Sequence, residues 1–228
     1  QMALEEINET GGIHGRKITL LVEDSGYDPK KAVLAAQKLV NQDRIFMMLG
    51  HIGTAHNEAA MPIQFEKDVI NFFPLTAARS MYEPFHRLKF STLPTYYAQI
   101  HSALPKLVRQ KNVTKVCAIY QDDDFGLEVL QGVQDGLKAR QMGLTDKASF
   151  KRGTTDFSSQ VAKMQASGCE LVVLGTIIRE TVGAIATARK FTREVIIPQA
   201  HEYDESENFP VDLAQAHETI AHLLAEAR

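Results

Sequence analysis

The sequence predicts an α/β protein made of two doubly wound lobes, each with a parallel sheet. Three observations indicate this fold: short apolar runs alternate with amphipathic segments of helical length, the runs are apolar throughout, and the alternation pauses once, at residues 91–97, before it restarts. Continuous apolar runs are typical of parallel strands that helices cover on both faces. We therefore expect a first lobe at residues 1–93 and a second at 94–198.

Local signals place the elements of the first lobe. An amphipathic helix opens the chain, and residues 17–24 (KITLLVED) predict a buried strand after it. Asp28 is suited to cap the next helix, at 28–42, and Pro29 fits its first turn. Pro62 is expected to kink or shorten the helix in which it lies. The remaining predicted elements are a strand at 44–50, a helix at 54–68, a strand at 69–74 and an extended piece at 87–94.

The second lobe repeats the alternation. Its predicted helices lie at 97–112, 125–141, 156–168 and 179–192, and its predicted strands at 115–123, 147–152 and 170–176. Residues 199–228 differ in kind, because an acidic stretch at 201–210 precedes a helical pattern that no strand follows. We treat 199–228 as a helical C-terminal segment, either native to the fold or joined from another protein.

Composition excludes several classes of function. With 25 basic and 28 acidic side chains and a net charge of -3, the chain lacks the basic field that nucleic acid would require. No run reaches the roughly 18 apolar residues that span a bilayer, and no signal peptide precedes the opening helix. Because the chain begins in mid-element, a missing signal peptide does not favour the cytoplasm.

The two cysteines, Cys117 and Cys169, both lie in or beside apolar runs. This setting favours buried small hydrophobic residues over a disulfide or a redox pair.

The stretch GHIGTA, at residues 50–55, marks a corner where a strand ends and a helix begins. Gly50 and Gly53 let the backbone approach a ligand closely, Thr54 can cap the helix or offer its hydroxyl, and the helix amides favour an anion. A carboxylate ligand fits this chemistry. The alternative is a tight strand-to-helix turn without a ligand, since such turns also need glycine and capping residues.

Other chemistry has little support. His51 and His56 are five residues apart, off the i, i+4 face that a metal pair on a helix uses, and no further ligand completes the set. The acidic QDDDFG, at 121–126, could hold a cation but is more typical of a solvated corner before a helix. Nucleophile, phosphate-loop and dinucleotide motifs are absent, so we expect no enzyme, no metal and no cofactor.

Four stretches, at residues 3–40, 50–55, 121–139 and 153–175, together resemble the type I periplasmic binding proteins. More narrowly, they are similar to the branched-chain amino-acid (Leu/Ile/Val) branch of ABC-transporter substrate-binding proteins, over about residues 1–190. In that family a strand precedes the opening helix and the chain later returns to the first lobe, so we expect a chain truncated at both ends. The resemblance implies a ligand held between two lobes that close by a hinge, docking on ABC permease subunits, and export to the periplasm or as a lipoprotein.

The resemblance also implies a set of ligand-binding residues. The hydroxyl for the ligand carboxylate falls at Thr54 beside Gly53, and an aromatic wall falls at Phe125, where relatives often have tyrosine. The apolar positions favour a carboxylate with an apolar or aromatic body over a polar amino acid. The other implied residues follow two further strands: Leu75, Thr76 and Ala77, and Thr176, Ile177 and Ile178.

Residues 187–213 resemble the N-terminal helix of the acyl-CoA dehydrogenases, without that family's flavin site or catalytic glutamate. A fusion or a chance likeness of amphipathic helices would explain this match. The sequence thus predicts an extracytoplasmic solute-binding protein for a small amino acid or an apolar or aromatic carboxylate. The alternatives are a ligand-sensing receptor or regulatory domain of the same fold, and an inactive fragment or fusion.

Overall fold

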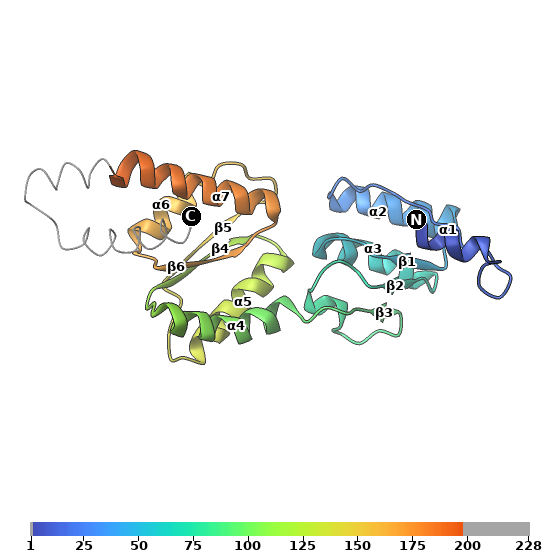
Figure 1. Cartoon of the computed structure of the whole chain (residues 1–228), viewed down its shortest axis with the longest axis horizontal. Helices are drawn as coiled ribbons and strands as arrows, with labels where there is room; N and C mark the ends of the chain where they lie inside the picture. Colours follow the sequence, from blue (N-terminus) through green and yellow to red (C-terminus); the bar gives the residue numbers. More distant parts are fainter. Residues whose placement is uncertain (1, 198–228) are drawn as a thin grey trace, which may run out of the picture. The chain divides into compact units, whose positions relative to one another are not determined.

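The computed structural model describes residues 2–197 (Figure 1). The chain divides into two compact units, Gln1–Leu93 and Pro94–Arg228. The expected C-terminal segment at 199–228 lies outside the described residues. Both units contain a three-stranded parallel sheet, as expected for an α/β fold of this class.

The first unit contains a sheet in the order β1-β2-β3 and three α-helices. Asp28 accepts hydrogen bonds from the amides of Lys30 and Lys31, and Pro29 is the first helical residue, so the predicted start of α2 is confirmed. The elements are α1 (Met2–Glu9), α2 (Pro29–Gln37) with a π-helical turn η1 (Lys38–Gln42), β1 (Met47–Leu49), α3 (Thr54–Glu66), β2 (Ile70–Phe72), the 3-10 turn η2 (Arg79–Met81) and β3 (Lys89–Phe90).

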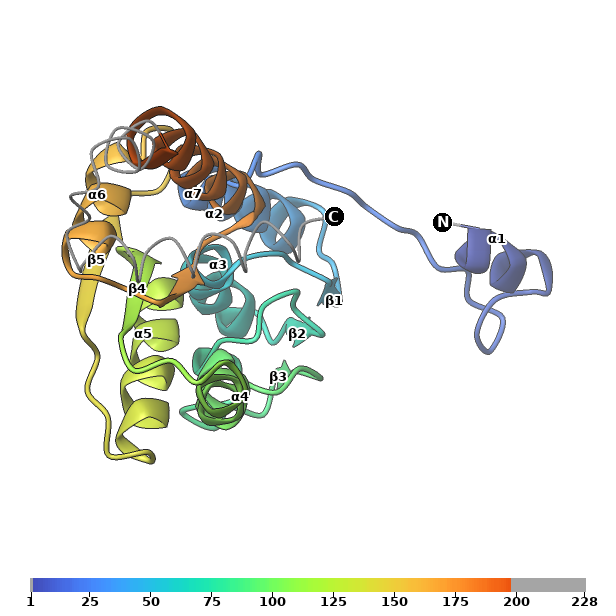
Figure 2. The same ribbon diagram turned by 60° about the vertical axis from the view of Figure 1, so that its left-hand side comes forward.

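Helices α2 and α3 lie side by side, and α3 packs on one face of the sheet (Figure 2). The contact with α2 buries Ala32 and Ala36. On the sheet side, the amide of Asn71 in β2 donates to the Asn57 side chain of α3 over 3.2 Å. Of the two effects expected of Pro62, shortening does not occur, because α3 continues past Pro62 to Glu66. Met61 and Gln64, on either side of Pro62, are buried.

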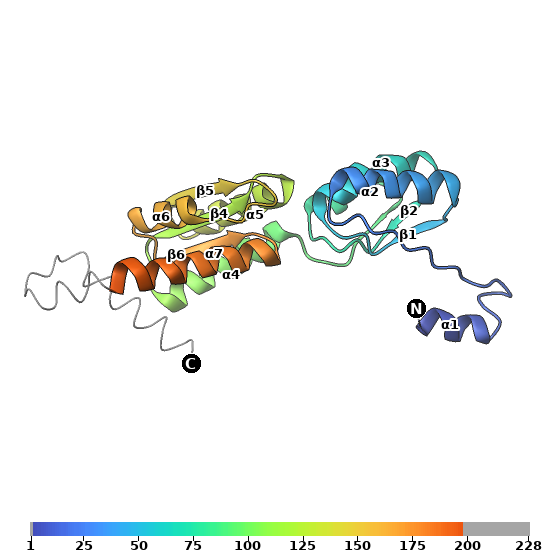
Figure 3. The same ribbon diagram turned by 90° about the horizontal axis from the view of Figure 1, so that it is seen from above.

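The expected strand at residues 17–24 is not formed. This segment is extended but pairs with no described strand, and Leu20 and Val22 are 47% and 79% exposed. Helix α1 before it buries no residue and lies apart from the sheet (Figures 2 and 3). The prediction is wrong because an apolar run becomes a strand only where a neighbouring strand can accept its backbone hydrogen bonds.

The second unit has a sheet in the order β5-β4-β6, with α6 and α7 on one face and α4 and α5 on the other (Figure 1). Its elements are α4 (Tyr96–Lys111), β4 (Val116–Gln121), α5 (Asp124–Lys138), β5 (Asp146–Phe150), α6 (Ser158–Ala166), β6 (Leu171–Gly175), α7 (Ile178–Phe191) and the π-helical turn η3 (Thr192–Ile196).

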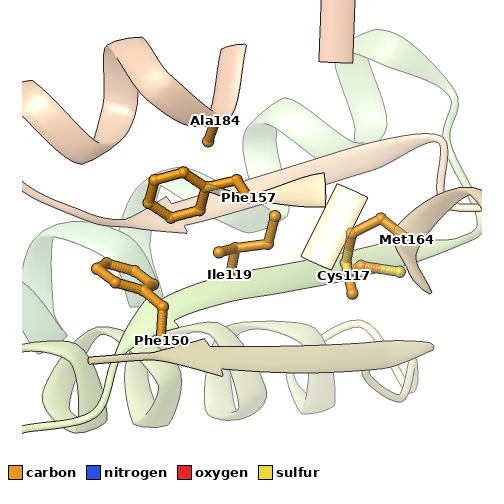
Figure 4. Packing of buried hydrophobic residues seen from close by; sticks show 6 residues of the cluster. All are labelled: Cys117, Ile119, Phe150, Phe157, Met164 and Ala184. Atoms are coloured by element: carbon orange, nitrogen blue, oxygen red, sulfur yellow. The ribbon is translucent and has the colours of Figure 1, made fainter. Parts of the chain in front are cut away.

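Each face of this sheet carries a hydrophobic cluster. The cluster under α6 and α7 comprises Cys117, Ile119, Phe150, Phe157, Met164 and Ala184 (Figure 4). The cluster under α4 and α5 comprises Leu104, Val108, Val116, Val133 and Leu137. All the predicted elements of this lobe begin within two residues of the observed ones, because the strands alternate with amphipathic helices.

The interpretation of the cysteines as separate buried side chains is wrong. Cys117 and Cys169 form a disulfide, with their Cα atoms 5.8 Å apart. The amides of Glu170 and Leu171 both donate to the carbonyl of Lys115, which brings the start of β6 beside β4 and places Cys169 against Cys117. The pairing depends on a crossover that separates the two cysteines by 52 residues, so local apolar context did not reveal it.

Candidate functional site

The loops that follow β1 and β2 are hydrogen-bonded to each other at the carboxyl edge of the first sheet. The amide of Leu75 donates to the carbonyl of His51 over 3.0 Å, and the amide of Gly53 donates to the carbonyl of Leu75 over 3.3 Å. Ile52 and Leu75 form a parallel bridge that extends the pairing of the strands. The first unit therefore brings together the two predicted ligand loops, at the edge where open α/β sheets bind ligands.

Thr54 and Thr76 join these loops through their side chains. Their hydroxyl oxygens are 2.7 Å apart, and the two residues are 5% and 1% exposed. The hydroxyl of Thr76 also accepts from the amide of Ala78 over 3.3 Å. Both predicted hydroxyl residues thus belong to one buried polar contact.

Thr54 does not cap α3, contrary to one of the two roles expected for it. Thr54 is the first helical residue, and the N-cap is Gly53, which makes no side-chain capping hydrogen bond. Thr54 does not cap its own helix because it occupies the position after the N-cap, and its hydroxyl contacts that of Thr76 instead. The amides of this helix start are suited to an anionic group such as a carboxylate.

Gly53 is required at this corner by both conformation and space. Its φ of 94° lies in a region that favours glycine. A Cβ atom there would lie 2.4 Å from Nδ1 of His56 and 3.0 Å from Cε2 of Tyr27. Gly50 also has a positive φ, but a Cβ there would meet nothing within 4 Å.

Exposure differs sharply among the predicted residues of the first unit. Leu75 is 58% exposed and can offer an apolar side chain to a ligand, whereas Ala77 is only 3% exposed. Ile52, which sequence reasoning did not select, is 51% exposed beside Leu75. The loops therefore combine an uncapped helix start with two exposed apolar side chains.

His51 and Asn57 were not selected from the sequence as residues that shape this site. Asn57 is fully buried, and its side-chain amide donates to the carbonyls of His51 and Gly53 over 2.7 and 2.8 Å. The rings of His51 and His56 are edge to face at 6.5 Å. Burial, and secondarily the charge of His56, lowers the pKa of His51 from 6.5 to about 4. The position of Asn57 three residues into the helix was the available signal, since that position faces the preceding loop.

In the second unit, the acidic corner after β4 is a helix cap. The carboxylate of Asp123 accepts from the amide of Gly126 over 3.2 Å and pairs with Arg152 over 2.8 Å. Gln121 also donates to Asp123. Gly126 allows this turn, because a Cβ there would lie 1.9 Å from the carbonyl oxygen of Gln121.

Phe125 lies in the first turn of α5 and is partly buried. Its ring packs edge to face on Tyr96, the first residue of α4, with ring centroids 4.9 Å apart. This pair forms an aromatic surface at the carboxyl end of β4.

The loop after β6 carries the last three predicted residues. The hydroxyl of Thr176 hydrogen-bonds that of Thr181, so Thr176 joins the loop to α7. Ile177 is partly buried, and Ile178 is 85% exposed. Helix α7 begins without a side-chain cap. Each predicted residue therefore lies at the carboxyl edge of the sheet in its own unit.

Within residues 2–197, no group of three or more His, Cys, Asp and Glu side chains is placed to hold a metal ion. In the same part of the chain, every helix is too short or too polar to cross a bilayer.

Comparisons with protein families add independent information. The model of a family described as periplasmic binding protein matches residues 1–206. The expected likeness of residues 187–213 to acyl-CoA dehydrogenases is not supported, because this match extends across most of that segment.

Two curated relatives illustrate the similarity. An amino acid binding protein of Pseudomonas aeruginosa is 30% identical over 177 residues, which is 76% of this chain and 46% of the relative. The Leu/Ile/Val-binding protein of Escherichia coli K12 is 26% identical over 77% of this chain and 47% of the relative. The chain thus spans about half the length of the curated relatives it matches.

Solved structures agree in fold. A substrate-binding periplasmic protein from Ralstonia solanacearum has a TM-score of 0.73 and 26% identity, covering 82% of this chain and 53% of that chain. A solute-binding protein from R. palustris, solved in complex with 4-hydroxybenzoate, has a TM-score of 0.72 and 17% identity, covering 85% of this chain and 53% of that chain.

Proposed function

Because this chain belongs to the periplasmic binding protein family, we propose that it is an extracytoplasmic solute-binding protein of an ABC transporter. Its ligand is a small amino acid or an apolar or aromatic carboxylate, which it delivers to permease subunits in the membrane. The ligand names of the relatives, amino acids and 4-hydroxybenzoate, share a carboxylate on a compact, largely apolar body and support this ligand class.

One observation carries the proposal. The buried contact between Thr54 and Thr76 holds the loop after β2 against the uncapped start of α3. Donors that are already in place cost little reorganisation when an anion arrives, and hydrogen bonds to a charged acceptor are stronger than neutral ones. We assign the ligand carboxylate to the first-turn amides of α3, with the Thr54 hydroxyl as a further donor.

The apolar part of the ligand is assigned to exposed apolar side chains. In the first unit these are Ile52 and Leu75. In the second unit Phe125, held by Tyr96, and Ile178 have the same character. Aromatic and aliphatic side chains around a few fixed polar groups are typical of small-molecule sites.

Calorimetric titration and thermal shift test this function. The probes are L-leucine, 4-hydroxybenzoate and succinate, with leucinol as the control ligand that lacks the carboxylate. Thr54→Val removes the hydroxyl and keeps the shape, and its matched control Thr54→Ser keeps the hydroxyl. Phe125→Ala is matched by Phe85→Ala, at a side chain that is 90% exposed.

We expect saturable binding of one carboxylate probe and none of leucinol. Thr54→Val should weaken binding about 10- to 100-fold, the range for a hydrogen bond to a charged group, whereas Thr54→Ser should retain it. Phe125→Ala should weaken binding more than Phe85→Ala. Cooperative melting without a response to any probe would contradict the proposal, as would binding that is unchanged by Thr54→Val.

A further inference from the structure

The disulfide between Cys117 and Cys169 lies in the core of the second unit. Cys117 belongs to β4, the central strand of the sheet, and is fully buried. Cys169 is partly buried and packs on the same cluster, where Met164 also lies (Figure 4). Its sulfur is 3.9 Å from the sulfur of Met164.

The cross-link closes a large part of the unit. Between the two cysteines, 52 positions apart, the chain forms α5, β5 and α6 before it returns to β6. Joining residues this far apart removes much of the conformational freedom of the unfolded chain. The bond also connects β4 to the start of β6, the strand that pairs with β4 along Val116–Tyr120.

We infer that this disulfide is a redox lock on the folding of the second unit: it forms while the unit is open and is shielded from reductants once the core closes. The inference stands apart from the proposed ligand binding. It rests on a fully buried cysteine in the central strand, joined to a distant segment across one hydrophobic cluster.

The chemistry is thiol–disulfide exchange with a dithiol oxidant in its disulfide form. The thiolate of one cysteine attacks a sulfur of the oxidant and displaces its other sulfur as a thiolate. The second cysteine then attacks the mixed disulfide, which leaves the oxidant as a dithiol. Cys117 and Cys169 lose two protons and two electrons in total, and the oxidant gains them.

Burial of Cys117 determines the order of disulfide formation and folding. Attack on a disulfide needs in-line access of a thiolate to one of the sulfurs, and the core of β4 denies that access on the Cys117 side. On the Cys117 side, oxidation must therefore precede closure of the core and reduction must follow its opening, so only the partly buried Cys169 sulfur is left for a reductant to attack in the folded chain. A bond of this kind belongs to a protein that folds in an oxidising compartment.

The experiment uses the full chain, purified without reductant. Reduction by dithiothreitol is followed over time by iodoacetamide labelling and mass spectrometry, in buffer and in urea near the midpoint of unfolding. Urea unfolding is then compared for the oxidised chain and for the chain reduced in urea and refolded with reductant. The reduced wild-type chain keeps both sulfur atoms, so the comparison isolates the cross-link from packing. The double variant Cys117→Ala and Cys169→Ala controls for other effects of the reductant.

We expect no labelled cysteine in the purified chain, slow reduction in buffer and reduction at least ten times faster in urea. Reduction should lower the ratio of folded to unfolded second unit about a thousand-fold, from the size of the closed loop. The double variant should not respond to reductant. If the double variant fails to fold, the comparison of the oxidised with the reduced wild-type chain still tests the inference. Free thiols in the purified chain, equal reduction rates with and without urea, or a change below about ten-fold on reduction would overturn the inference.

Discussion

At the scale of single residues, the depressed pKa of His51 makes stability depend on pH. The folded-state value of about 4 lies below the usual 6.5, chiefly because of burial. Between pH 6.5 and 4 the unfolded chain binds a proton that the folded chain does not. The contribution of His51 to the free energy of unfolding is therefore fully present above pH 6.5 and is lost as the pH drops toward 4. We expect His51 to contribute a loss of about 1 to 2 kcal/mol in the free energy of unfolding, after allowance for solvent screening of this partly exposed ring.

Urea unfolding at pH 7.5, 5.5 and 4.5 measures this dependence. His51→Gln removes the titrating group and should flatten the decline, whereas the control His14→Asn changes an exposed histidine and should leave it unaltered. A decline of the same steepness in His51→Gln would assign the effect to other groups.

At the scale of elements, the packing of α4 on α5 gives opposite predictions for two glycines. A Cβ at Gly132 would lie 3.1 Å from the carbonyl oxygen of Tyr97 and 3.2 Å from its Cα, both backbone atoms of the facing helix. A Cβ at Gly136 would meet α4 at 3.4 Å, an ordinary contact. Alanine favours a helix over glycine by about 1 kcal/mol. We expect Gly136→Ala to raise the free energy of unfolding by up to about 1 kcal/mol, and Gly132→Ala to lower it by about 1 kcal/mol because α4 must move.

Chemical unfolding followed by circular dichroism distinguishes the two variants by sign. A stabilising Gly132→Ala would mean that α4 yields readily and that the close approach of the two helices is not a constraint.

The elements also show what the sequence can predict. Local signals were sufficient for α2, where Asp28 and Pro29 fix the start, and for the alternating helices and strands of the second unit. They failed for residues 17–24, where strand formation depends on a neighbour elsewhere in the fold.

The site depends on distance along the chain in the same way. Thr54 and Thr76 are 22 residues apart, and family resemblance selected both, whereas spacing alone gave no reason to join them. The pairing of Cys117 with Cys169, 52 residues apart, likewise had no local signal strong enough to predict it. Contacts of this type follow from the sheet pairing, which short sequence windows do not contain.

At the scale of the whole molecule, the two units differ in how their cores are built. Among residues 2–197, both clusters of buried hydrophobic side chains lie in the second unit, which also holds the disulfide. The strands of the first unit are only two or three residues long. Apolar side chains beside them remain in solvent, and Phe46, for example, is 75% exposed. Local opening is easier where few apolar contacts must be broken, so we expect the first unit to open at a lower free energy than the second.

Hydrogen exchange followed by mass spectrometry of the oxidised, ligand-free chain tests this difference. Amides of β1 and β2 should exchange at least about ten-fold faster than those of β4, because each 1.4 kcal/mol of opening free energy changes the exchange rate ten-fold. The paired backbone amides of α4, outside both sheets but packed on the second cluster, serve as the internal reference and should exchange as slowly as β4. If β1, β2 and β4 exchanged at one common rate, the chain would open as a single cooperative body, and the division of stability between the units inferred from their cores would be wrong.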